Sequence, residues 1–136
     1  MYFANKDQIP VSIRLDELVE TADRISRDNG WHDPMLPTTP AEQVALLHSE
    51  ASEFLEEVRA RRPFGETYYE DVTTPHPETG EPVPDRKPCG PAAEIADCII
   101  KACEIAGRYD IDVVTAVREK LAFNSRRGYR HGDKPF

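Results

Sequence analysis

Apolar residues recur every three or four positions in four stretches of the chain, which is the spacing that lines one face of an α-helix. The first stretch covers residues 12–29 and is followed by Gly30, a residue that favours the end of a helix. The second runs to about residue 61, the third covers residues 91–106, and the fourth lies near the C-terminus. The pattern therefore predicts four main helices.

Local capping signals indicate where two of these helices begin. Thr39-Pro40-Ala41-Glu42 combines a capping threonine, a proline at the first helical position and a glutamate three residues after the cap. Asp112 can cap the last helix in a similar way. On the second helix the spacing predicts a stripe that faces the core, formed by Val44, Leu47, Ala51, Leu55 and Val58.

Residues 62–90 differ from the rest, because they contain six prolines, three glycines and little periodicity. We expect a long loop here, with room for a small hairpin around Thr79-Gly80. The predicted fold class is all-α, a four-to-five-helix bundle with this long Pro-rich loop between helices two and three. Residues 1–136 form a single domain in this prediction, and its segments are an N-terminal arm at 1–11, the loop or insertion at 62–90 and a basic tail at 128–136.

Composition narrows the classes of partner. A chain of 136 residues with a net charge of -8 is expected to repel nucleic acid and anionic lipid surfaces. No apolar run approaches the length of about 20 residues that a membrane span needs. We therefore expect neither nucleic-acid nor membrane partners. Residues 1–7 lack the basic and apolar regions of a signal peptide, so we expect a cytoplasmic protein. Cys89, Cys98 and Cys103 form no C-x-x-C pair and are expected to be small buried side chains.

Two pairs of acids are the strongest chemical signal in the chain. Glu50 and Glu53 are three residues apart in the second helix, and Glu94 and Asp97 are three apart in the third. Because a helix turns about 100° per residue, each pair places two carboxylates on one face. Four convergent carboxylates form the oxygen-only site that Mg²⁺ and Mn²⁺ prefer. A polar strip in contact with water explains the same spacing without a ligand, although the apolar third helix is expected to be central.

Two further features are candidates for ligand contacts. Lys120, Asn124 and Arg127 share one face of the fourth helix, in a C-terminal region that is basic although the chain is acidic. They can form a phosphate clamp or a solubilising tail. Trp31, the only tryptophan, lies in a proline-broken connector and can either cover the end of the bundle or stack on a nucleobase.

Taken in chain order, these groups resemble MazG-like members of the all-α nucleoside triphosphate pyrophosphohydrolase superfamily. That family has an E-x-x-E helix followed by an E-x-x-D helix. The likeness extends over roughly residues 15–132, and the stretches that carry it are 46–53, 87–91, 94–97 and 124–132. Ser49-Glu50 departs from the two adjacent glutamates of many relatives, and residues 70–85 resemble an insertion.

The resemblance implies a Mg²⁺-dependent hydrolysis of (d)NTP to (d)NMP and pyrophosphate, in the house-cleaning of nucleotide pools. It implies that Mg²⁺, or Mn²⁺ as a substitute, is bound by the two acid pairs, with Glu53 also as the residue that activates water. It also implies that Trp31 contacts the base and that the phosphates are bound by Lys120, Asn124, Arg127, Tyr129 and Arg130. A homodimer or a dimer of dimers is the expected assembly.

Two other classes of function stay open on the sequence alone. The first is a non-catalytic nucleotide-binding or regulatory helical dimer, and the second is a purely structural dimer whose acids are solvated. The sequence contains no G-x-x-x-x-G-K-[ST] loop and no E-x-x-H pair, which disfavours a P-loop enzyme and a di-iron carboxylate bundle.

Overall fold

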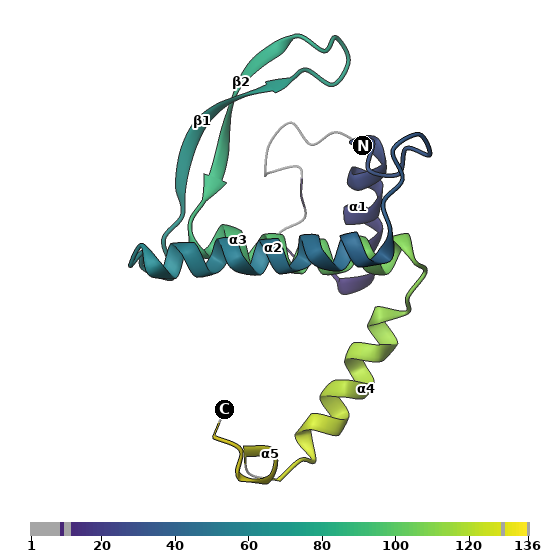
Figure 1. The fold of residues 1–136 in the computed structure, drawn as a ribbon, viewed down its shortest axis with the longest axis vertical. Coiled ribbons are helices and arrows are strands. Elements are labelled where there is room, and N and C mark those ends of the chain that lie inside the picture. The colour runs from purple at the N-terminus through teal and green to yellow at the C-terminus, as the bar shows by residue number, and fades with distance from the viewer. Residues whose placement is uncertain (1–8, 10–11, 129, 136) are drawn as a thin grey trace.

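The structure is a computed structural model that describes residue 9, residues 12–128 and residues 130–135. Two long helices, α2 and α3, lie side by side; α1 packs against α3 near the C-terminal end of α3, and a β-hairpin stands over the other end (Figure 1). The elements in order are α1 (Leu15–Asp28), α2 (Pro40–Arg59), β1 (Tyr68–Pro75), β2 (Pro82–Cys89), α3 (Pro91–Arg108), α4 (Val113–Ser125) and α5 (Arg130–Asp133). In the described part of the chain, no helix has both the length and the apolar character needed to cross a membrane.

The predicted helix starts are confirmed. The Thr39 N–H donates to Glu42 Oε2 at 2.6 Å, and the Glu42 N–H donates to Thr39 Oγ1 at 3.2 Å, which completes the capping box of α2. Asp112 Oδ1 accepts from the Thr115 N–H at 3.0 Å at the start of α4. These caps satisfy backbone donors that have no partner inside the helix, so the local sequence was sufficient to place them.

The predicted all-α class is wrong, and so is the prediction of an irregular loop over most of residues 62–90. β1 and β2 form a two-stranded antiparallel sheet of eight residues a strand, in a register that runs from Tyr68 opposite Cys89 to Pro75 opposite Pro82. The small hairpin expected around Thr79-Gly80 is therefore only the tip of a much longer one. The protein combines helices with a small sheet.

The prolines that suggested a loop are compatible with this ribbon because of their alternation. Just beyond the paired strands, the His76 N–H donates to the Glu81 carbonyl at 2.7 Å. This bond shows which residues of each strand direct their backbone N–H and C=O groups toward the other strand. By the same alternation the even-numbered residues of β2 direct their backbone outward, where no N–H donor is required. Pro82, Pro84 and Pro88 all occupy these outward positions.

Small side chains allow α1 and α3 to approach closely. Ala22, Cys103 and Ala106 are each less than 5% exposed, and a Cβ atom added at Gly107 would lie 2.6 Å from the Asp23 Cβ. Cys89 is also buried, so the expectation of buried cysteines is confirmed for two of the three, while Cys98 is half-buried. The described core is therefore built from small residues rather than from large aliphatic ones.

Most of the large apolar residues remain exposed. The stripe predicted to face the core from α2 is an example, because Val44, Leu55 and Val58 are 49%, 53% and 37% exposed. α4 projects away from the other long helices (Figure 1), and none of its residues is buried. The helices therefore do not close into the predicted bundle.

The total accessible surface also indicates that the chain does not form a compact bundle. The accessible surface is 10542 Å² for a chain of 15.4 kDa. A compact monomer of this mass exposes about 7,200 Å². The excess is about 3,300 Å² per chain, whereas obligate dimers bury about 1,000 to 2,500 Å² or more on each partner.

Gly90 connects β2 to α3, and we predict that Gly90→Ala destabilises the protein by more than about 1 kcal/mol. Its φ of +106° is unfavourable for other residues, and an added Cβ would lie 2.7 Å from the Glu66 carbonyl oxygen. Urea denaturation measures the effect. Gly65→Ala is the matched control, because a Cβ there meets no atom within 4 Å. Equal stability of the two variants would contradict the prediction.

Candidate metal centre

Three of the four predicted acids meet between α2 and α3. Glu50, Glu53 and Glu94 each offer a carboxylate oxygen, and these three oxygens lie within 4.8 Å of one another. Glu94 is buried, Glu50 is half-buried and Glu53 is exposed. α2 directs Glu50 and Glu53 toward α3, as predicted, but it leaves most of the stripe that was predicted to face the core exposed.

Glu94 is the most constrained of these acids. It is 7% exposed, and its Oε2 atom is buried without a hydrogen-bond partner among the described residues. Burial raises the pKa of the Glu94 carboxyl most, and the negative charges of Glu53 and Asp97 raise it further, as does a hydrogen bond between the Glu94 and Glu53 carboxyl groups. A buried carboxylate oxygen without a donor is unfavourable in the folded state unless a proton or a cation compensates it.

The same physical causes act on Glu50 and Asp97. Burial is the largest contribution that raises the pKa of each carboxyl, followed by the charge of Glu53. Asp97 lies outside the group of three oxygens, but Glu53 and Glu104 raise its pKa, so it belongs to the same acidic environment. The four predicted acids thus form one electrostatic cluster with three members in close contact.

Glu57 lies one turn after Glu53 in α2 and contacts the base of the hairpin. Its Oε1 accepts a hydrogen bond from the Tyr68 hydroxyl at 2.9 Å, and its Oε2 lies 3.9 Å from Arg62 Nε. The Arg62 guanidinium in turn lies 4.5 Å from the centre of the Tyr68 ring. Glu57 is therefore engaged by its own partners and links the start of β1 to α2.

Two lysines supply positive charge to the cluster. Lys87 on β2 lowers the pKa of both Glu94 and Asp97, against the effect of burial. Lys101 on α3 likewise lowers the pKa of Glu50 and Asp97, and it also forms an ion pair with Glu104. Neither lysine was among the predicted site residues.

The predicted phosphate clamp is not brought to the acids within one chain. Lys120, Asn124 and Arg127 are exposed, and the first and last lie 5.6 and 5.7 Å from the Phe123 ring centre on the projecting α4 region. Arg130 donates to the Pro135 carbonyl instead. Tyr129 lies outside the described residues.

Trp31 lies at the other end of α3. It is 49% exposed, its carbonyl accepts from Arg108 Nη1 at 2.8 Å, and Lys101 Nζ lies 5.7 Å from its ring centre. Lys101 also lowers the pKa of Glu50, so the same lysine acts on both the Trp31 ring and the acidic cluster. The exposed part of the ring is available to a planar ligand.

The residues that were missed carried weak signals. Lys87 stands two residues before the buried Cys89, and alternation along a strand places both side chains on one face. This signal depends on recognising β2 as a strand, which the prolines concealed. Glu57 lies one turn after Glu53 in α2, and its partner Tyr68 could be found only from the hairpin.

The donor set fits a hard divalent cation. The three convergent ligands are all carboxylates, as Mg²⁺ and Mn²⁺ prefer. Oxygens around Mg²⁺ at about 2.1 Å stand roughly 3 to 4 Å apart, so a spread of up to 4.8 Å needs only small side-chain rotations to close. The buried Oε2 atom of Glu94, which has no partner in the described part of the chain, would gain a counter-charge from such a cation.

Comparison of the chain with protein-family models, with curated proteins and with solved structures found no match. The resemblance to MazG-like proteins therefore stays a prediction that depends on the motifs alone.

We predict that Glu94→Gln raises the melting temperature by about 3 °C or more at pH 7 to 8 in the presence of EDTA. The pKa values of Glu50, Glu94 and Asp97 are raised in the fold, so their protonation stabilises the folded state. This stabilisation is fully present at a pH below their ordinary pKa. That contribution is lost as the pH rises through the raised values, and the amide of the variant avoids part of the loss.

Thermal melts across pH test this prediction, with Glu56→Gln, an exposed acid on α2, as the control. The advantage of Glu94→Gln is expected to disappear at about pH 4, where the carboxyl of the wild type is protonated. A variant that is less stable than the wild type at neutral pH in EDTA would contradict the account.

Proposed function

We propose that the protein is a Mg²⁺-dependent nucleoside triphosphate pyrophosphohydrolase. The observation that carries the proposal is the convergence of Glu50, Glu53 and Glu94, together with the buried Glu94 oxygen that has no described donor. The order of the motifs along the chain adds support, because the same E-x-x-E and E-x-x-D pairs suggested this reaction from the sequence.

Glu50, Glu53 and Glu94 would hold the metal, and Asp97 would complete the acidic environment. When bound there, Mg²⁺ supplies positive charge that offsets the charge of the triphosphate and stabilises the oxygens of an in-line displacement. Without such a cation, an acidic site of this kind repels an anionic substrate. The proposal therefore makes nucleotide binding dependent on the metal.

Glu53 is the member of the group that is open to solvent, so it can orient a water molecule and accept its proton. That water attacks the α-phosphorus, the bond from this phosphorus to the bridging oxygen breaks, and pyrophosphate leaves. Glu50 and Glu94, which are less exposed, are assigned only to holding the metal. The exposed Glu53 thus has two roles, holding the metal and activating water, whereas Glu50 and Glu94 only hold the metal.

We also propose that the chain acts as a homodimer or a dimer of dimers. The excess surface, the exposed stripe on α2 and the unburied α4 support this assembly. Ile99 on α3 and Leu121 on α4 are 50% and 64% exposed, which adds to the apolar surface that a second copy can cover. Lys120, Asn124 and Arg127 of α4 stay assigned to phosphate binding, in an assembly where α4 is packed.

Glu53→Gln is expected to lower Mg²⁺-dependent pyrophosphate release by about a hundredfold or more, because an amide cannot take the proton from water. The measurement is pyrophosphate release from a panel of dNTPs and NTPs, with EDTA as the metal-free arm. Glu56→Gln, which changes an exposed acid paired with Arg59, is expected to retain the wild-type rate. Release that persists in EDTA or in Glu53→Gln would count against the proposal.

For the assembly, light scattering at micromolar concentration is expected to give at least twice the mass of one chain. Leu55→Glu introduces a charge into the exposed stripe and is expected to lower that mass or to unfold the protein. Ser52→Glu, at an exposed polar position of the same helix, is the control. A wild-type protein that is monomeric and stable would refute the dimer.

A further inference from the structure

An open cavity of about 420 Å³ lies between the base of the hairpin and α3. Lys87 and Asp97 contribute its polar side chains with Thr67, and the apolar part of its wall comes mainly from α3. The volume is within the range of small-molecule sites, which run from about 300 to 1,000 Å³. Asp97, whose pKa is raised by Glu53, lines the cavity and belongs to the acidic cluster, so it connects the cavity with the proposed metal centre.

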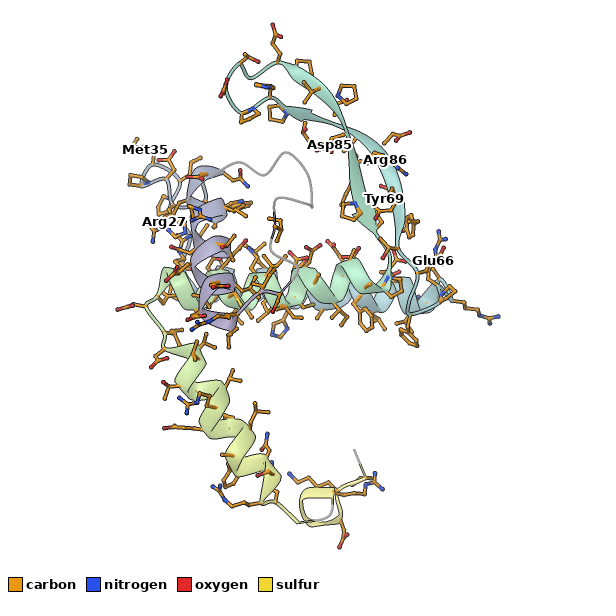
Figure 2. The ribbon with its side chains drawn as sticks, turned by 180° about the vertical axis from the view of Figure 1, so that it is seen from behind. Arg27, Met35, Glu66, Tyr69, Asp85 and Arg86 are labelled. Carbon is orange, nitrogen blue, oxygen red and sulfur yellow. The ribbon has the colours of Figure 1, made fainter. Side chains whose placement is uncertain are left out.

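Lys87 is the cation of this cavity, and the pairing of the hairpin directs it there. Its strand neighbour Cys89 is buried, and Tyr68, opposite Cys89, donates to Glu57 of α2, so this face of the hairpin looks toward the helices. Arg86 lies on the opposite face, with its guanidinium 4.7 Å from the Tyr69 ring centre (Figure 2). The charge of Lys87 reaches Glu94 and Asp97, whereas Arg86 is occupied on the other side.

The apolar wall is a stripe of side chains along one face of α3. Ala92, Ala96 and Ile100 follow at intervals of four residues, so they stand above one another over two turns. Two alanines leave space for a flat group, and Ile100 closes the stripe. Asp97 directly follows Ala96 in α3, so it flanks this stripe. A cavity with a lysine and a carboxylate beside an apolar stripe suits a metal-bound molecule that has a phosphate group and an uncharged part.

We propose that this cavity binds the nucleotide, with Lys87 on a phosphate oxygen and the Ala92–Ala96–Ile100 stripe against the nucleoside. The inference rests on the proposed function, and it places the phosphate-binding cation of the single chain on the hairpin rather than on α4. Lys87 and the metal centre then hold the triphosphate from two sides. The base of the hairpin, which belongs to the 87–91 stretch and not to the insertion at 70–85, becomes part of the substrate site.

Calorimetric titration with two probes tests the two halves of the cavity in the presence of Mg²⁺. Inorganic triphosphate has only the phosphate end, and α,β-methylene ATP has a nucleoside and resists hydrolysis between its α- and β-phosphates. Lys87→Met is expected to weaken both probes by about tenfold or more, and Lys87→Arg is expected to retain most of the affinity. Arg86→Met, one residue away on the opposite face, is expected to bind both probes like the wild type.

Ala96→Leu fills the apolar stripe at an exposed position, so the fold is expected to tolerate it. This variant is expected to weaken α,β-methylene ATP several-fold and to leave inorganic triphosphate unchanged. Ala102→Leu, at an exposed position of α3 outside the cavity wall, is the matched control.

Metal binding by the same variants separates the two proposals. If Mg²⁺ binds to the wild type and to Lys87→Met, but Lys87→Met keeps the wild-type affinity for triphosphate, the cavity assignment is overturned and the metal centre stands. If Mg²⁺ does not bind to the wild type, the proposed function fails and the cavity assignment fails with it. Loss of affinity in Lys87→Met with Mg²⁺ binding intact supports the cavity as the nucleotide site.

Discussion

The repulsion among carboxylates between α2 and α3 is the constraint on which the rest of the structure depends. Glu94 is almost fully buried, and Glu50 and Glu53 face it from the neighbouring helix. Burial and like charge both raise the pKa of Glu94, so the fold is less stable at neutral pH than it would be with neutral side chains there. Such a cost is typical of sites that bind a cation, because the same charges that destabilise the empty fold provide the affinity.

The hairpin and the lysines limit this cost on one side of the cluster. Tyr68 and Arg62 engage Glu57, and Lys87 brings positive charge to Glu94 and Asp97. α4 gives no such compensation within one chain, because it projects away from the acids and buries none of its residues. An assembly that packs α4 and the apolar stripe of α2 would therefore change the surroundings of the site as well as its stability.

The parts of the fold that the sequence predicted correctly are those that local interactions decide. The capping box of Thr39 and Glu42, the Asp112 cap and the ends of the helices involve residues within a few positions of one another. The spacing of Glu50 and Glu53 on one face also follows from a single helix, and the structure then brings Glu94 to them.

The parts that failed depend on partners that are distant in sequence. Pro82, Pro84 and Pro88 suggested a loop, because only the register with β1 shows that their backbone nitrogens face away from the partner strand. Val44 and Leu55 were predicted to lie in the core but are exposed, because periodicity identifies an apolar face without showing what covers it. The role of Lys87 could not be seen for the same reason, because its face is set by the hairpin.

Titration of the wild-type protein with Mn²⁺, followed by the electron paramagnetic resonance signal of the free ion, tests the central claim most directly. Convergent carboxylates that form a metal centre predict saturable loss of the free-ion signal, its recovery when Mg²⁺ is added in excess, and weaker binding in Glu94→Gln. A free-ion signal that grows in proportion to added Mn²⁺, with no bound fraction above that of a protein lacking such a cluster, would contradict the account.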